Sequence, residues 1–222
     1  MTTSLKIDFV SDVSCPWCVV GLRALEQALA RVQPDIEAAI HFQPFELNPA
    51  MAPSGQDITE HITEKYNISV AQADANRENI RLRGAELGFV FSGNNAEGGG
   101  RSRIYNTFDA HRLLHWAGLE SLATQKALKE ALFAAYFTEG QSPGSHEVLA
   151  RLADQVGLEG ARAREILASD TYAAEVRERE QFYTSHGIHS VPAIIINDKH
   201  LISGGQPVDV FEKALRQAAA DV

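Results

Sequence analysis

The chain has 222 residues, 45% of them hydrophobic, and its 29 acidic and 20 basic side chains give a formal charge of −9. This acidic balance argues against a nucleic-acid partner, because phosphate backbones are bound by basic surfaces. No apolar run approaches the roughly 18 residues that a membrane-spanning helix needs, and the first residues contain no apolar leader. These features predict a cytoplasmic globular protein without a membrane partner.

The first distinctive segment is SCPWC (residues 14–18), where a strand pattern changes to a helix pattern. Residues 5–10 (LKIDFV) alternate in polarity and predict a strand. After the segment, apolar residues recur every three or four positions up to about Val32, which predicts a helix. Because proline is favoured at the first position of a helix, Ser14 or Cys15 is the expected N-cap.

Cys15 and Cys18 have the spacing and the setting of a redox pair. At the start of a helix, unpaired N–H groups and the helix dipole favour the thiolate of Cys15, which is the reactive form. Cys18 follows one turn later on the same face, within reach of a disulfide. The pair predicts a thiol–disulfide centre with Cys15 as an exposed nucleophile. A zinc site completed by His111 and His115 is one alternative, and simple burial of both cysteines is another.

Periodicity predicts the elements that follow. Residues 35–45 form a second expected strand, and a strand–helix–strand unit this short predicts parallel strands. The glycine-rich stretch 89–100 predicts a mobile surface loop. Helices are expected over residues 58–66 and 70–86, capped by Asp57 and Ser69, and then over 104–117, 122–137, 147–156 and 161–168.

Beyond residue 170 the pattern returns to strands. The expected elements are a helix over 171–185, strands over 193–197 and 200–203 that form a hairpin, and a terminal helix over 208–220. The order is therefore β–α–β, a long helical stretch, and α–β–β–α. It predicts an α/β fold in which residues 1–56 and 170–222 form a sheet domain, with 57–169 as a large all-helical insertion.

Four segments carry a resemblance to a known family. SDVSCPWC (residues 11–18) and HSVPAIII (189–196), together with the helical insertion, resemble the DsbA family of thioredoxin-fold oxidoreductases. NTFDAHRLLHWA (106–117) and SGGQPVDVF (203–211) are similar to its FrnE-like, cytoplasmic branch. The resemblance implies a thioredoxin-like fold (βαβ…αββα) interrupted by the helical insertion.

The resemblance also assigns roles around Val191 and Pro192. It implies that Pro192 follows a cis peptide bond and faces the cysteine pair, and that the Val191 backbone pairs with the cysteine of a bound peptide or of glutathione. Pro16, Trp17 and Pro192 are then structural residues of the active site. Taken alone, a proline before a buried strand marks only the start of that strand.

The implied activity is that of a dithiol–disulfide oxidoreductase, in which Cys15 attacks and Cys18 resolves a mixed disulfide. Its partner would be a thiol- or disulfide-containing protein or glutathione, with glutathione as a candidate co-substrate and no other cofactor or metal. Asp8 or Asp12 could accept the proton of Cys18, although solvated carboxylates are the more common role for such residues. A homodimer is a candidate assembly.

A related branch supplies the alternative function. The glutathione-dependent 2-hydroxychromene-2-carboxylate isomerases and kappa-class glutathione transferases resemble this chain in fold and insertion, and they typically carry serine at the position of Cys15. Two cysteines favour redox chemistry instead. His111 and Arg112 have no assigned role, and we expect them on a helix surface.

Overall fold

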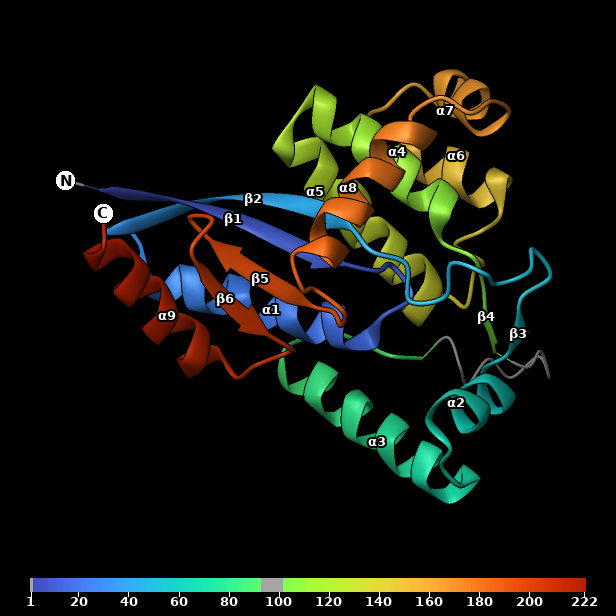
Figure 1. Ribbon diagram of the computed structural model, residues 1–222, viewed down its shortest axis with the longest axis horizontal. Helices are drawn as coiled ribbons and strands as arrows, with labels where there is room; N and C mark the ends of the chain where they lie inside the picture. Colours follow the sequence, from blue (N-terminus) through green and yellow to red (C-terminus); the bar gives the residue numbers. More distant parts are fainter. Residues whose placement is uncertain (1, 93–101) are drawn as a thin grey trace.

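The computed structural model describes residues 2–92 and 102–222, and its centre is a four-stranded sheet in the order β2–β1–β5–β6 (Figure 1). The strands are β1 (Thr3–Ser11), β2 (Ile36–Pro44), β5 (Ala193–Ile196) and β6 (His200–Ser203). β1 pairs in parallel with β2, whereas β5 runs antiparallel to both β1 and β6. The predicted parallel strand–helix–strand unit and the C-terminal hairpin are both confirmed.

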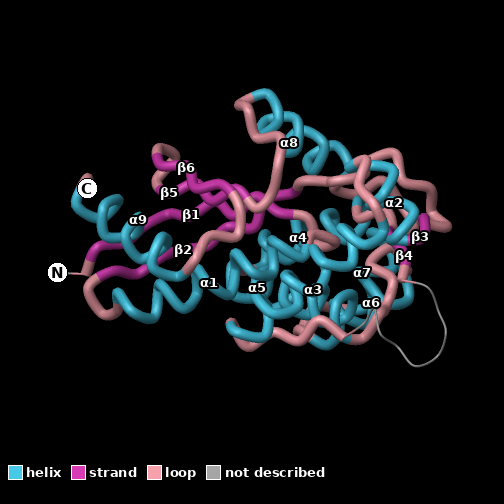
Figure 2. The backbone as a smooth tube through the Cα atoms, turned by 90° about the horizontal axis from the view of Figure 1, so that it is seen from below, coloured by secondary structure: helices cyan, strands magenta, loops and turns pink. Residues whose placement is uncertain are grey.

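The sheet separates two layers of helices, as Figure 2 shows from below. Because β-strand side chains alternate between faces, Leu5, Ile7 and Phe9 all point to the layer formed by α1 (Pro16–Val32) and α9 (Val208–Ala220). Val10 points the other way and packs with Tyr183 of α8 (Ala173–Ser185). The sheet is thereby buried on both faces near the end of β1, directly before the cysteines.

The outer edge of β2 is covered by helix α5 (Leu122–Phe133). Gln125 accepts a hydrogen bond from Phe42 N at 3.0 Å, and its Nε2 donates to Phe42 O at 3.0 Å and to Leu114 O at 3.2 Å. A single side chain therefore satisfies both backbone groups of a residue in an outer strand.

The middle of the chain is helical. Besides α5, it contains α2 (Ile58–Tyr66), α3 (Val70–Glu86), α4 (Phe108–Glu120), α6 (His146–Gln155) and α7 (Gly160–Leu167). Helices α4 to α7 share a core of their own. The predicted caps are confirmed: Asp57 accepts from Thr59 N, and Ser69 and Gln72 form a reciprocal capping box.

Helix α4 begins later than the sequence predicts. Instead of continuing the helix back to Ile104, Arg103–Ile104 form the short strand β4, which pairs with β3 (Gln56–Asp57). Asn106 Oδ1 accepts from Phe108 N at 2.9 Å, and this local bond starts the helix at Phe108. Apolar spacing alone did not reveal the turn.

Two further expectations need correction. The helix predicted over 122–137 changes at its end to a π-helical turn, η2 (Ala134–Thr138). Of the predicted mobile loop over 89–100, Phe89 is buried and Phe91 packs against Phe137 with ring centroids 5.2 Å apart. Residues 93–100 lie outside the described residues.

The division into a sheet domain (1–56 and 170–222) and an insertion (57–169) stays a prediction. Phe133 and Tyr136 belong to the core of the sheet and α1 although they lie within the insertion range. Across residues 2–92 and 102–222, we find no helix with the length and apolar character needed to cross a membrane.

Candidate active site

Cys15 and Cys18 lie at the start of α1 as free thiols. Cys15 is the N-cap residue, with extended backbone angles, and Pro16 is the first helical residue, as predicted. Cys18 N donates to Cys15 O at 3.1 Å, so the two residues close the first turn. Cys18 is 0% exposed and Cys15 only 4%, so the expectation of an exposed Cys15 is wrong.

Val191 and Pro192 lie beside Cys15, although they are more than 170 positions away in the sequence. The Cys15 Sγ atom lies 3.6 Å from Val191 O, and the Val191–Pro192 bond is cis, as the resemblance implies. The Pro192 ring packs on α1, where a Cβ atom at Gly21 would lie 3.0 Å from Pro192 Cγ. The Gln33–Pro34 bond is also cis, which the sequence did not indicate.

Trp17 is half-buried and packs against the turn that precedes α9. A Cβ atom at Gly205 would lie 3.2 Å from Trp17 Cε3 and 3.1 Å from Trp17 O. Glycine at position 205 therefore lets the segment 203–211 approach the CPWC turn closely. This contact links two of the segments that carry the family resemblance.

Asp12 is buried beneath the cysteine turn and organises it. Its Oδ1 accepts from Ser14 N at 3.2 Å, and its Oδ2 accepts from Leu47 N at 2.7 Å. His111 Nε2 lies 3.6 Å from Asp12 Oδ1. Burial acts to raise the pKa of Asp12, but the His111 interaction and the two N–H groups outweigh it and leave this pKa below its ordinary value.

The expectation that Asp8 and Asp12 are solvated is therefore wrong. Asp8 is also buried, where it pairs with Lys6 at 2.9 Å and accepts from Gln43 Nε2 at 2.6 Å. Each carboxylate has one partner nearby in the sequence, Lys6 or Ser14, and one distant partner, Gln43 or Leu47. The Asp12 carboxylate holds the loop before Cys15 by accepting hydrogen bonds from Ser14 N and Leu47 N.

Lys129 is the main site residue that the sequence analysis missed. It is 0% exposed, and its Nζ lies 5.0 Å from the centroid of the Phe133 ring. Burial lowers the pKa of Lys129 to about 8, although the nearby Cys18 and Asp12 act to raise it. A sequence signal existed, because residues 125, 128, 129 and 132 share one helix face, and that face is buried.

The charge on Lys129 acts on the pKa of Cys18. Burial, together with the neighbouring Cys15 sulfur, raises the pKa of Cys18 well above its ordinary value, and Lys129 acts in the opposite direction. The second cysteine is therefore a neutral thiol at neutral pH. An ammonium group nearby lowers the cost of its deprotonation.

His111 and Arg112 are both buried, so the expectation of a surface position is wrong. His111 faces Asp12. Arg112 is structural, since its guanidinium donates to the carbonyl oxygens of Ile166, Ser169 and Thr171 at the end of α7 and just beyond it.

Helix α2 approaches the Cys15 side of the site. Tyr66, the last residue of α2, is 55% exposed, and its partial burial and the negative charge of Cys15 both raise its pKa. Lys65 Nζ donates to Leu47 O at 2.9 Å and to Asn48 Oδ1 at 2.7 Å, which fixes the end of α2 to the loop after β2.

A metal centre has no ligand set among residues 2–92 and 102–222. No group of three or more histidine, cysteine, aspartate or glutamate side chains in this part of the chain is arranged to hold an ion. The zinc alternative with His111 and His115 therefore lacks support, since His111 faces Asp12 and His115 stacks near Tyr172 with ring centroids 5.2 Å apart.

Comparison with known families agrees with this arrangement. The model of the DSBA-like thioredoxin domain matches residues 6–216. The chain belongs to this family. As a DsbA-like protein, it has the α/β fold with a thioredoxin-like sheet that the sequence predicted, with the helical segment between its two halves.

Similar proteins span nearly the whole chain. A probable DsbA oxidoreductase from Streptomyces coelicolor is 32% identical, with a TM-score of 0.87, and the match covers 98% of this chain and 91% of that one. The Bacillus subtilis protein YwbO is 27% identical over 97% of this chain and 96% of its own length.

More distant structures share the fold of this DsbA-like chain. The Pseudomonas aeruginosa cytosolic disulfide reductase DsbM, solved with glutathione, is 17% identical with a TM-score of 0.63, covering 96% and 98% of the two chains. A 2-hydroxychromene-2-carboxylate isomerase is 15% identical with a TM-score of 0.67, covering 97% of each. Both branches considered from the sequence are therefore present among its structural neighbours.

Proposed function

We propose that this DsbA-like chain is a dithiol–disulfide oxidoreductase whose redox pair is Cys15 and Cys18. One observation carries the proposal: a free Cys15 caps α1, with its Sγ 3.6 Å from Val191 O and a buried free Cys18 one turn later. A helix N-terminus stabilises a thiolate at the capping position. The similarity to a probable DsbA oxidoreductase supports the same class of reaction.

The proposed reaction proceeds in two exchanges. The Cys15 thiolate attacks one sulfur of a substrate disulfide, whose S–S bond breaks and releases the other sulfur as a thiolate. Cys18 then loses its proton and attacks Cys15 Sγ, releasing the second substrate thiolate. The substrate gains two electrons, and the protein is left with a Cys15–Cys18 disulfide. Run in reverse, the same steps oxidise a dithiol.

The remaining site residues would position the substrate. Because Val191 O lies 3.6 Å from Cys15 Sγ, we expect the Val191 backbone to pair with an extended segment that carries the substrate cysteine. Pro16, Trp17 and Pro192 would shape the groove around that segment. The substrate class is a thiol- or disulfide-containing protein or glutathione in the cytosol, where glutathione serves as a co-substrate.

Equilibration in glutathione redox buffers tests the proposal directly. After acid quenching and alkylation, mass spectrometry is expected to find Cys15 and Cys18 joined to each other in oxidising buffer and both alkylated in reducing buffer. Insulin reduction by the dithiol form is measured alongside. The matched control is the double variant Cys15→Ser, Cys18→Ser. An unchanged rate of insulin reduction by that variant would refute the proposal.

A glutathione-dependent isomerase or transferase is the second candidate, supported by the shared fold of the 2-hydroxychromene-2-carboxylate isomerase. Such an enzyme needs a bound glutathione thiolate but no second cysteine. It would turn over a chromene carboxylate or form a glutathione conjugate, and Cys18→Ser would leave that turnover intact. The oxidoreductase proposal predicts no such turnover.

A further inference from the structure

A partly open cavity of about 220 Å³ lies beside the outer strand β2, lined by residues of β2 and of helices α4, α5 and α8. Its polar lining consists mainly of nitrogen-bearing side chains: His41 and Gln43 from β2, His111 and His115 from α4, Lys129 from α5 and Arg179 from α8. None of the described side chains that line it is acidic. The cavity is therefore biased towards negatively charged contents.

Two of these side chains are buried and lack a hydrogen-bond partner among the described residues, although His111 Nε2 lies 3.6 Å from Asp12 Oδ1. Lys129 is 0% exposed and His111 is 2% exposed, and neither Lys129 Nζ nor His111 Nε2 has a hydrogen-bond partner within the described parts of the chain. A buried ammonium group left unpaired is costly, and this cost favours a ligand that accepts hydrogen bonds.

Asp12 does not fill this role. Its two oxygens already accept from Ser14 N and Leu47 N, and the His111 Nε2 atom remains 3.6 Å away. The carboxylate offsets part of the buried positive charge, but it is not a hydrogen-bond partner of Lys129 Nζ, which stays without one in the part of the chain that the structure describes. Lys129 lines the cavity, so a ligand in the cavity could supply the missing acceptors.

The volume limits the size of the ligand. A water molecule occupies about 30 Å³ in the liquid, so the cavity has room for several waters or for one ion of phosphate or small carboxylate size. Pockets for drug-sized ligands start at about 300 Å³, which excludes glutathione or a nucleotide as a fully enclosed ligand.

We propose that this cavity binds a small oxyanion, held by Lys129 and His111 at its base and by Arg179 at its mouth. Charge-assisted hydrogen bonds to an ammonium and a guanidinium group are the strong bonds of such a site. Arg179 is exposed, so it can meet the ion before entry. His41 and His115 are half-buried and supply further ring nitrogens along the wall.

This site is separate from the groove at Cys15. None of Cys15, Trp17, Val191 or Pro192 lines the cavity. Anion binding therefore does not depend on the proposed redox reaction, and it can be measured without any thiol chemistry. The two regions meet at Lys129, whose charge acts on Cys18.

Calorimetric titration with inorganic phosphate tests the proposal, and a parallel titration with succinate separates a phosphate source from a carboxylate source. Ionic strength is held constant with potassium chloride, near neutral pH. One saturable site is expected on the wild-type protein. Lys129→Met, which keeps an unbranched side chain one atom shorter and removes the charge, is expected to weaken binding at least about tenfold. Arg179→Gln is expected to weaken it about threefold or more.

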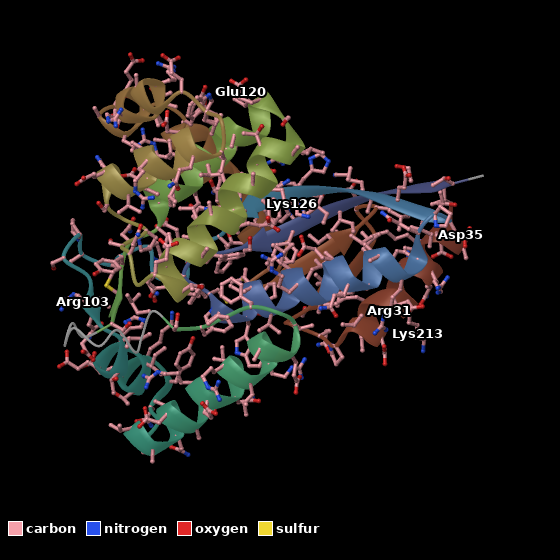
Figure 3. All side chains as sticks on the ribbon, turned by 180° about the vertical axis from the view of Figure 1, so that it is seen from behind. Arg31, Asp35, Arg103, Glu120, Lys126 and Lys213 are labelled. Atoms are coloured by element: carbon pink, nitrogen blue, oxygen red, sulfur yellow. The ribbon has the colours of Figure 1, made fainter. Side chains whose placement is uncertain are left out.

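Lys126→Met is the matched control. Lys126 is on the same helix, labelled in Figure 3, and its Nζ pairs with Glu26 at 2.6 Å instead of lining the cavity. This variant is expected to bind like the wild type. If Lys129→Met does not fold, the proposal is tested by the affinity of Arg179→Gln and by NMR of the wild-type protein. On titration with the anion, the imidazole signals of His111 and His115 are expected to shift.

Three results would overturn the proposal. The first is the absence of saturable binding of either anion up to about 10 mM. A dissociation constant above that concentration would be too weak for a specific binding site. The second is binding by Lys129→Met and Arg179→Gln with wild-type affinity. The third is an NMR response confined to surface histidines such as His61 and His186.

Discussion

Cys15 and Cys18 are separated by one helical turn, yet their surroundings differ in kind. The Sγ atom of Cys15 lies 3.6 Å from a backbone carbonyl, Val191 O. Cys18 lies in the field of Lys129, inside a buried polar cluster that includes Asp12. In the proposed reaction, the first region would receive the chain segment that carries the substrate cysteine, and the charge of Lys129 in the second would favour deprotonation of Cys18. Two cysteines of one motif can thus be tuned by separate parts of the fold.

Serine substitutions give the largest expected contrast between the two regions. Cys15→Ser is expected to lose all measurable insulin reduction, because the attacking sulfur is gone. Cys18→Ser should still attack and then accumulate a mixed disulfide with substrate, because the resolving thiol is missing. Mass spectrometry of quenched reactions measures the trapped species. Trapping by Cys15→Ser would reverse the assignment of roles.

Lys129→Met tests the region around Cys18 through the pH dependence of the unfolding free energy. The folded-state pKa of Lys129 is about 8, below the ordinary 10.5, so between these values the unfolded chain binds a proton that the folded chain does not. Wild-type stability should therefore rise across this pH window by about 3 kcal/mol relative to the methionine variant. Below about pH 8 the buried charge should cost the wild type stability compared with methionine.

Urea unfolding of both proteins from about pH 7 to about pH 10.5, in buffer without phosphate or carboxylate, measures this difference. Other titrating groups are common to both proteins and cancel in the comparison. Parallel stability curves across the window would show that Lys129 keeps an ordinary pKa.

Asp12→Asn is expected to lower the free energy of unfolding, because it disturbs the hydrogen bonds that Asp12 accepts from Ser14 N and Leu47 N. One of the N–H groups of Ser14 and Leu47 would face an amide NH₂ group, and leaving a buried donor unsatisfied costs about 1–3 kcal/mol. The folded pKa of Asp12 is below the ordinary 3.8, so its ionic contribution is present above that value and is lost as the pH falls further. The two proteins should converge in acid.

Unfolding free energies at neutral pH and near pH 3 measure the effect of Asp12→Asn. The control is Asp35→Asn, at an exposed position after α1 that is labelled in Figure 3. That change is expected to stay within about 0.5 kcal/mol. An equal loss in both variants would remove the special role of Asp12.

Gly21→Ala is the smallest expected effect and acts on the Cys15 side. Alanine gains about 0.5–1 kcal/mol in a helix interior, but its Cβ would approach Pro192 Cγ to 3.0 Å, and overpacking costs about 1–3 kcal/mol. We expect a net loss of about 1 kcal/mol by urea unfolding and a slower exchange reaction. A more stable variant would mean that Pro192 moves away without cost.

Local signals explain what the sequence could predict. The strand, turn and helix around SCPWC, the caps Asp57 and Ser69, and the C-terminal hairpin each depend on neighbours within a few positions. The delayed start of α4 was missed, although it too is local, because apolar spacing hides the bond from Phe108 N to Asn106.

The charged half of the site depends on distant partners and could not be predicted. Asp12 is satisfied by Leu47 N, and Arg112 by carbonyl oxygens more than fifty positions away. When these partners are unknown, a prediction from sequence places aspartate, arginine and lysine on the surface. Lys129 could have been suspected, because it shares a helix face with Leu128 and Leu132, which are fully buried.

The hydrogen bonds of Gln125 also decide where the sheet can grow. They take the place of the two backbone hydrogen bonds that a neighbouring strand would form with Phe42. A fifth strand therefore cannot pair there without displacing the Gln125 side chain. At the opposite edge, β6, Gln206 Nε2 donates to Ser203 O at 2.8 Å, but Leu201 in the middle of the strand is 54% exposed. Of the two sheet edges, β6 is therefore the one at which an added strand would displace no side chain of helix α5.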